Sequence, residues 1–117
     1  IVAEPRDVFA LEKTGEYNGK YWVLGGLISP LDGIHPESLR IDELVRFLES
    51  ETIKEIIFAI NPTIEGDATT LYLTKRLSNF QVPLTKLAYG LPMGSDIDYA
   101  DEMTLQKALT ERTVVHA

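Results

Sequence analysis

The fold is decided by residues 56–67, which read Ile56-Ile57-Phe58-Ala59-Ile60-Asn61-Pro62-Thr63-Ile64-Glu65-Gly66-Asp67. The apolar run at 56–60 is typical of a strand that is buried on both faces, as in a parallel sheet. Residues 61–67 leave that strand and open a helix-like segment. Functional loops of open α/β sheets lie at the carboxyl ends of strands. We therefore expect a functional site at residues 61–67.

Strand-like and helix-like segments alternate along the chain. Apolar runs bounded by turn residues predict strands at 1–3, 21–24, 53–60, 83–88 and 113–116. Apolar residues at helical spacing predict helices over 5–14, 39–50, 66–78 and 99–109, the last with Asp98 as its N-cap. This alternation predicts an α/β fold with a mostly parallel sheet and helices on both faces.

Composition narrows the class of protein. A chain of 117 residues with no cysteine has no disulfide and no thiolate metal site of its own, and we expect it in the cytoplasm. No apolar run is long enough for a membrane helix, so no membrane partner is expected. The net charge of −7 disfavours direct wrapping of nucleic acid and suits a basic protein partner. The chain does not begin with Met, which suggests a piece of a longer protein.

Three carboxylates are candidates for chemistry. Glu4 ends the first predicted strand, and Glu65 and Asp67 follow the third. If these strands are neighbours, the three side chains converge at one edge, where a Mg²⁺ ion would find hard oxygen ligands. The alternative is electrostatic, because acidic residues in the first turn of a helix are favoured by its dipole. Both interpretations stay open at the level of the sequence.

Other polar groups give weaker signals. The acidic residues of 95–102 have no phosphate-binding glycine loop to accompany them, so capping explains them better than nucleotide hydrolysis. The histidines and serines have no evident partner for nucleophilic catalysis. Tyr17, Tyr21 and Trp22 around Lys20 suit either base stacking or an edge strand packed on the core. The apolar loop 24–34 either folds back onto the core or forms an exposed patch for a partner.

Several motifs together span nearly the whole chain, among them Ser29-Pro30-Leu31-Asp32-Gly33-Ile34. The others are the segments 4–8, 14–17, 24–26, 61–69, 90–94 and 99–105. In combination they resemble the RecR family of bacterial recombination mediators. The resemblance implies a TOPRIM domain at 1–90, followed at 91–117 by a loop, a helix and a short strand that complete the domain or an oligomer contact.

The resemblance also implies function and partners. RecR proteins act with RecO, and in some pathways RecF, to load RecA onto gapped or single-stranded DNA, and they form ring-shaped homo-oligomers that encircle DNA. Full-length members carry an N-terminal helix-hairpin-helix region and a four-cysteine zinc finger. Neither part is found in this sequence, so the zinc and the main DNA contacts are expected outside it.

The TOPRIM pattern assigns the site residues by position. Catalytic TOPRIM domains pair a strand-end Glu, here Glu4, with an Asp-x-Asp motif and trailing acids, here Glu65 and Asp67. The Asp-x-Asp positions hold Asn61 and Thr63, which exchanges two anionic ligands for neutral ones and weakens a divalent-ion site. The resemblance therefore implies no enzyme activity, no cofactor in this chain beyond weak Mg²⁺, and a site that binds a partner. The alternative is a Mg²⁺-dependent TOPRIM enzyme acting on phosphodiester bonds.

Overall fold

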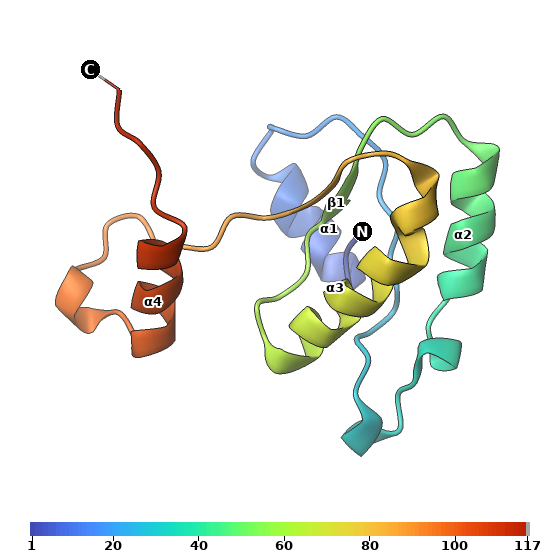
Figure 1. The fold of residues 1–117 in the computed structure, drawn as a ribbon, viewed down its shortest axis with the longest axis horizontal. Helices are drawn as coiled ribbons and strands as arrows, with labels where there is room; N and C mark the ends of the chain where they lie inside the picture. The colour runs from blue at the N-terminus through green and yellow to red at the C-terminus, as the bar shows by residue number, and fades with distance from the viewer. Residues whose placement is uncertain (117) are drawn as a thin grey trace. The chain divides into compact units, whose positions relative to one another are not determined.

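The computed structural model describes residues 1–116, which fall into two compact units, residues 1–87 and residues 88–116 (Figure 1). We call them the N-terminal unit and the C-terminal unit and describe each by itself. The N-terminal unit holds helices α1 (Pro5–Glu12), α2 (Ile41–Ser50) and α3 (Ile64–Leu77) and strands β1 (Ile56–Phe58) and β2 (Leu84–Lys86). The C-terminal unit holds helix α4 (Glu102–Thr110).

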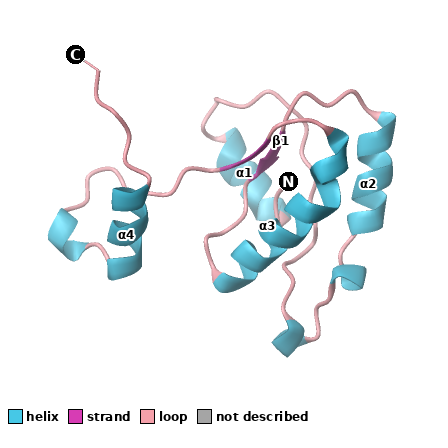
Figure 2. Ribbon diagram, in the orientation of Figure 1, coloured by secondary structure: helices cyan, strands magenta, loops and turns pink. Residues whose placement is uncertain are grey.

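The sheet of the N-terminal unit is parallel. Strands β1 and β2 pair in register Ile56↔Leu84, and α3 connects them as the crossover of a β-α-β unit. Val2 extends the arrangement because it forms parallel bridges to Val23 on one side and to Ala59 on the other. The predicted parallel α/β fold is confirmed, but the strands are shorter than predicted. The segments 1–3 and 21–24 pair through one bridging residue each, and little of the chain is strand (Figure 2).

The core lies where α2 and α3 pack against β1. The amphipathic pattern of α2 places Ile41, Leu44 and Leu48 inside, as the apolar spacing predicts. The buried cluster combines side chains from these elements with three from the segments between them or before them: Leu24, Leu39, Ile41, Leu44, Leu48, Ile56, Phe58, Ile60, Leu73 and Leu77. Helix α1 contributes no fully buried residue.

The two faces of β1 are covered unequally. Ile56 and Phe58 are buried in the core cluster, whereas Ile57 and Ala59, which alternate with them, are only partly buried. Successive side chains of a strand point to opposite faces, so one face of the sheet is sealed and the other is partly open. The continuous apolar run of the sequence suggested equal burial, and that expectation was wrong.

The loop 24–34 folds back onto the core, as the first of the two interpretations of this loop predicted. Leu24 is buried, and the hydroxyl of Thr69 on α3 accepts a hydrogen bond from the Ile28 N–H at 2.9 Å. Ser29 and Ile34 exchange two backbone hydrogen bonds of 2.9 Å, and Gly33 closes the turn between them at a φ of 72°. Leu31, at the tip of this turn, is the exception because its side chain is fully exposed.

The start of α4 differs from its prediction. The expected N-cap was Asp98, but residues 97–99 form a separate short 3-10 turn and Ala100 is extended. Asp101 is the N-cap, because its Oδ1 accepts from the Thr104 N–H at 2.7 Å and its Oδ2 accepts from the Thr104 hydroxyl at 3.0 Å. These bonds lower the pKa of Asp101 below its ordinary value, because they favour the charged carboxylate.

The strand predicted at 113–116 does not form within this chain, and its part in an oligomer contact stays a prediction. Residues 113–116 have no regular secondary structure, and Val114 and Val115 are largely exposed. Residues with β-branched side chains form a strand only where a second strand supplies the other half of the hydrogen-bond ladder. No such partner lies beside them within residues 1–116.

The start of α3 rests on a close backbone contact. A Cβ on Gly66 would overlap the carbonyl oxygen of Asn61 and lie 3.2 Å from Cγ2 of Ile60. Gly66 is itself buried in the first turn of the helix. Only a residue without a side chain lets α3 begin this close to the end of β1.

We predict that Gly66→Ala lowers the free energy of unfolding by at least the roughly 1–3 kcal/mol typical of overpacking, because the clash outweighs the roughly 1 kcal/mol that Ala gains over Gly in helix propensity. Urea denaturation of both proteins measures the difference. Gly90→Ala is the matched control, since nothing lies within 4 Å of a Cβ added at that position. Equal stability of Gly66→Ala and the unchanged chain would contradict the contact.

Candidate functional site

The site residues gather at the carboxyl edge of the sheet. Val2 is paired with Ala59, and in a parallel register Glu4 and Asn61 each follow that pair by two positions. On the other side, the Gly25 N–H donates to the carbonyl of Ala3 at 2.8 Å, which brings Gly25 to the same edge. We call this region, formed by Glu4, Gly25 and residues 61–67, the carboxyl edge.

Glu4 marks the point where the chain turns from the sheet into α1. It occupies the N-cap position, and its N–H donates to Oδ2 of Asp7 at 3.0 Å. The Asp7 N–H donates in turn to the carbonyl of Glu4 at 3.1 Å. This reciprocal arrangement is typical of a helix start, and it fixes the backbone that presents the half-buried Glu4 side chain.

Thr63 has a structural task at the start of α3. It is the N-cap, and its Oγ1 accepts a hydrogen bond from the Gly66 N–H at 3.0 Å. Its own N–H donates to the carbonyl of Asn61 at 2.9 Å, and its carbonyl accepts from the Asp67 N–H at 2.8 Å. The Thr63 hydroxyl therefore satisfies a backbone donor that the helix would otherwise leave unpaired.

Glu65 and Asp67 lie in the first turn of α3 and are exposed. Their charges stabilise the positive end of the helix dipole, as the electrostatic alternative expects. Within residues 1–116, no group of three Asp, Glu, His or Cys side chains is arranged to hold a metal ion. The convergence of Glu4, Glu65 and Asp67 on a shared ion stays a prediction.

The other polar candidates make local contacts. The hydroxyl of Ser29 donates to Oδ2 of Asp32 at 2.8 Å, and the hydroxyl of Ser95 donates to the carbonyl of Pro92 at 2.6 Å. His35 precedes a short 3-10 turn at residues 36–38. Trp22 packs against the core beside Phe47, so the edge-strand interpretation of the aromatic segment holds for this residue. None of these contacts builds a nucleophile with a base.

Two residues that support the carboxyl edge carry no chemical signal in the sequence. Thr69 is fully buried and links the loop 24–34 to α3, because its hydroxyl donates to the Glu65 carbonyl at 2.7 Å while accepting from Ile28. Gly66 is the second. Both lie on the buried stripe of α3, which runs through Gly66, Thr69, Leu73 and Leu77. That spacing of three and four residues was the available signal.

The helices described within residues 1–116 include none that is long and apolar enough to cross a membrane.

Each of the two units matches the model of a known protein family. The model of the Toprim domain matches residues 1–88, and the model of the C-terminal part of RecR matches residues 90–113. The recombination protein RecR of Gloeobacter violaceus is 54% identical over 112 residues, which cover 96% of this chain and 57% of the relative. The recombination protein RecR of Gloeothece citriformis is 57% identical over 112 residues, covering 96% and 56%.

A third relative, the recombination protein RecR of a Synechococcus species, is 54% identical over 115 residues, covering 98% of this chain and 60% of the relative. The chain thus spans less than two thirds of the length of these relatives. The two matched ranges, 1–88 and 90–113, extend through both units. The chain belongs to the RecR family of recombination proteins, and its residues 1–88 are a Toprim domain.

Proposed function

We propose that this chain is a noncatalytic Toprim module of a recombination mediator, which supports assembly of a RecR-type ring and binds RecO, and in some pathways RecF, so that RecA is loaded on gapped or single-stranded DNA. DNA contact comes through the full-length ring. The observation that carries the proposal is the use of Asn61 and Thr63 at the two positions where catalytic Toprim domains hold aspartates. A cytoplasmic location remains a prediction.

The hydrogen bonds at Thr63 support the absence of catalysis. A Mg²⁺ ion needs several hard oxygen donors, and carboxylates supply both the oxygen and the charge. Asn61 and Thr63 are neutral, and the Thr63 hydroxyl already accepts from the Gly66 N–H. The donor set at this edge therefore fits a resident Mg²⁺ ion poorly, and we derive no metal-dependent step from it.

The competing function is a Mg²⁺-dependent enzyme acting on phosphodiester bonds. The retained carboxylates of Glu4, Glu65 and Asp67 favour it, because a single carboxylate with water ligands sometimes suffices for Mg²⁺. The two functions differ in what the edge does with Mg²⁺, which makes the metal the discriminating probe.

We predict that Mg²⁺ titration of this chain, followed by NMR, produces no saturable shifts at Glu4, Glu65 and Asp67 and no DNA cleavage. The paired change Asn61→Asp and Thr63→Asp should create saturable shifts, because it restores two carboxylates. Asp is as good an N-cap as Thr, so this variant keeps the start of α3 intact. Metal-dependent cleavage by the unchanged chain would overturn the noncatalytic proposal.

The exposed acids of α3 support docking of a basic partner. Glu65 and Asp67 lie together in its first turn, and the chain as a whole carries a net charge of −7. Complementary charge raises association rates and fixes which surfaces meet. We therefore place the contact with RecO at the carboxyl edge.

We expect Glu65→Lys to weaken binding of RecO by roughly tenfold, since reversal of one charge in a complementary interface typically costs a few kcal/mol or less. The change should lower stability by no more than about 1 kcal/mol through the helix dipole. Isothermal titration calorimetry measures the affinity. Glu49→Lys on α2 is the matched control. Glu49 is also exposed and helical, but it lies in the last turn of α2, whereas Glu65 lies in the first turn of α3. Unchanged affinity of Glu65→Lys would remove this docking site.

The C-terminal unit supports self-association. Helix α4 has no buried residue, and most large apolar side chains of this unit are exposed. They are Leu91, Met93, Ile97, Tyr99, Met103, Leu109, Val114 and Val115. Apolar surface of this extent is typical of an interface, and a strand-forming segment at 113–116 without a partner suits pairing with another copy.

We predict that the chain associates with itself in a concentration-dependent manner in light scattering, and that Val115→Ser weakens the association about tenfold, because burial of one valine side chain contributes roughly 1.5 kcal/mol or more. Leu31→Ser, at an equally exposed apolar position of the N-terminal unit, should leave the association unchanged. A monomer at every concentration would contradict assembly through this unit.

A further inference from the structure

The sulfur atoms of this chain are confined to one surface. The sequence has two methionines and no cysteine, and both methionines lie in the C-terminal unit. Met93 is fully exposed, and Met103 is 72% exposed. Both belong to the exposed apolar side chains of that unit. Because cysteine thiols, which react with the same oxidants, are absent, oxidation of sulfur in this chain can only act on these two side chains.

Hydrogen bonds hold the backbone that presents each methionine. The carbonyl of Pro92 accepts from the N–H of Ser95 at 3.2 Å and from its hydroxyl at 2.6 Å, which closes a turn around Met93. Met103 lies in the first turn of α4, which the side chain of the N-cap Asp101 fixes. Both thioethers therefore project into solvent from defined points of the surface.

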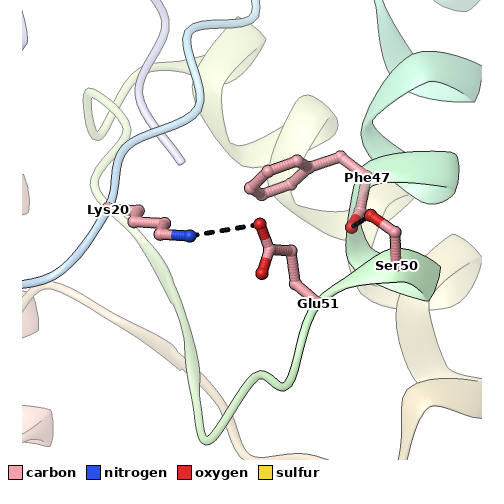
Figure 3. Close-up of polar contacts among 4 residues, drawn as sticks. All are labelled: Lys20, Phe47, Ser50 and Glu51. Carbon is pink, nitrogen blue, oxygen red and sulfur yellow. Dashed lines mark hydrogen bonds and ion pairs between the residues drawn. The ribbon is translucent and has the colours of Figure 1, made fainter.

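The N-terminal unit contains no sulfur atom. Its core cluster consists of leucine, isoleucine and phenylalanine side chains. Charged and aromatic groups meet on its surface, as in Figure 3, where Lys20 reaches Glu51 beside the Phe47 ring with 3.1 Å between the two charged atoms. Oxidation of methionine damages a protein where it puts a polar group into the core. In this chain it leaves the core unchanged and alters only the surface of the C-terminal unit.

Oxidation converts a methionine side chain from apolar to polar. Hydrogen peroxide transfers one oxygen atom to the sulfur, so that the O–O bond breaks, an S–O bond forms and water leaves. The sulfur loses two electrons, which the peroxide gains. The sulfoxide oxygen is a hydrogen-bond acceptor, and its burial in an apolar interface without a donor is unfavourable. Two sulfoxide reductases, one for each epimer of the sulfoxide, reverse the change.

We propose that Met93 and Met103 are a reversible oxidation site that controls self-association through the C-terminal unit, with a peroxide as the oxidant. This role rests on the proposed function, because it requires that the apolar surface of the C-terminal unit meets a second copy of the chain. In the dissociated chain both sulfur atoms are open to the oxidant, whereas association covers them. Oxidation therefore traps the dissociated chain, and reduction returns it to the associating form.

Analytical ultracentrifugation of the whole chain before and after mild treatment with hydrogen peroxide tests this role, and the intact mass counts the oxygen atoms added. We expect the chain with two sulfoxides to associate at least about tenfold more weakly, because each buried sulfoxide lacks the water that solvates it at the free surface. Treatment with both sulfoxide reductases should restore the association. The midpoint of urea unfolding, followed by the fluorescence of Trp22 in the N-terminal unit, should stay the same.

The double variant Met93→Leu and Met103→Leu is the matched control. Leucine keeps the apolar character and nearly the volume of methionine, so this variant should associate like the unchanged chain and ignore peroxide. Association that survives complete conversion to two sulfoxides would overturn the oxidation site and leave the proposed assembly standing. A reduced chain that stays monomeric at every concentration would overturn both. Loss of association by the double variant after peroxide, or a lowered urea midpoint of the oxidised chain, would assign the effect to another part of the molecule and overturn the oxidation site.

Discussion

The contact between Gly66 and the carbonyl of Asn61 is the constraint on which the carboxyl edge depends. Because Gly66 has no side chain, α3 begins directly against the end of β1. That closeness puts the Thr63 hydroxyl within hydrogen-bond distance of the Gly66 N–H, and it places Thr69, one turn further on, under the loop 24–34. The start of α3, the cap at Thr63 and the anchoring of the loop 24–34 therefore all depend on the close approach of Gly66 to Asn61.

At the carboxyl edge, the capping of α3 does not require a side chain that binds a metal ion. Position 63 must cap α3, and the side chains that cap helices well include both Asp and Thr. An aspartate there would serve the cap and a metal ion, whereas Thr63 serves the cap alone. The contact of Gly66 and the cap at Thr63 hold the start of α3 without any carboxylate at positions 61 and 63. Glu65 and Asp67 likewise need no metal ion, since the helix dipole stabilises acidic residues in the first turn of α3.

Sequence patterns predicted the alternation of elements and the parallel sheet, because these depend on local periodicity. They failed where the secondary structure depends on contacts with other segments of the chain. The segment 113–116 has strand-forming residues but no second strand, and Asp101 replaced Asp98 as the cap because Ala100 is extended. On α3 the conspicuous Leu71 is exposed, while the stripe through Gly66 and Thr69 is buried. A glycine and a threonine carry no hydrophobic signal, so their burial follows from close packing and a buried hydrogen bond that only the three-dimensional structure contains.

Val2 connects the two edges of the sheet. It is fully buried and pairs with Val23 and Ala59, so the segment 1–4 runs between two neighbours and ends at the carboxyl edge with Glu4. A net charge of −7, with Glu65 and Asp67 exposed at the carboxyl edge, favours the approach of basic segments over that of phosphates. The DNA contact that we propose for the full-length ring would then use surface outside the carboxyl edge.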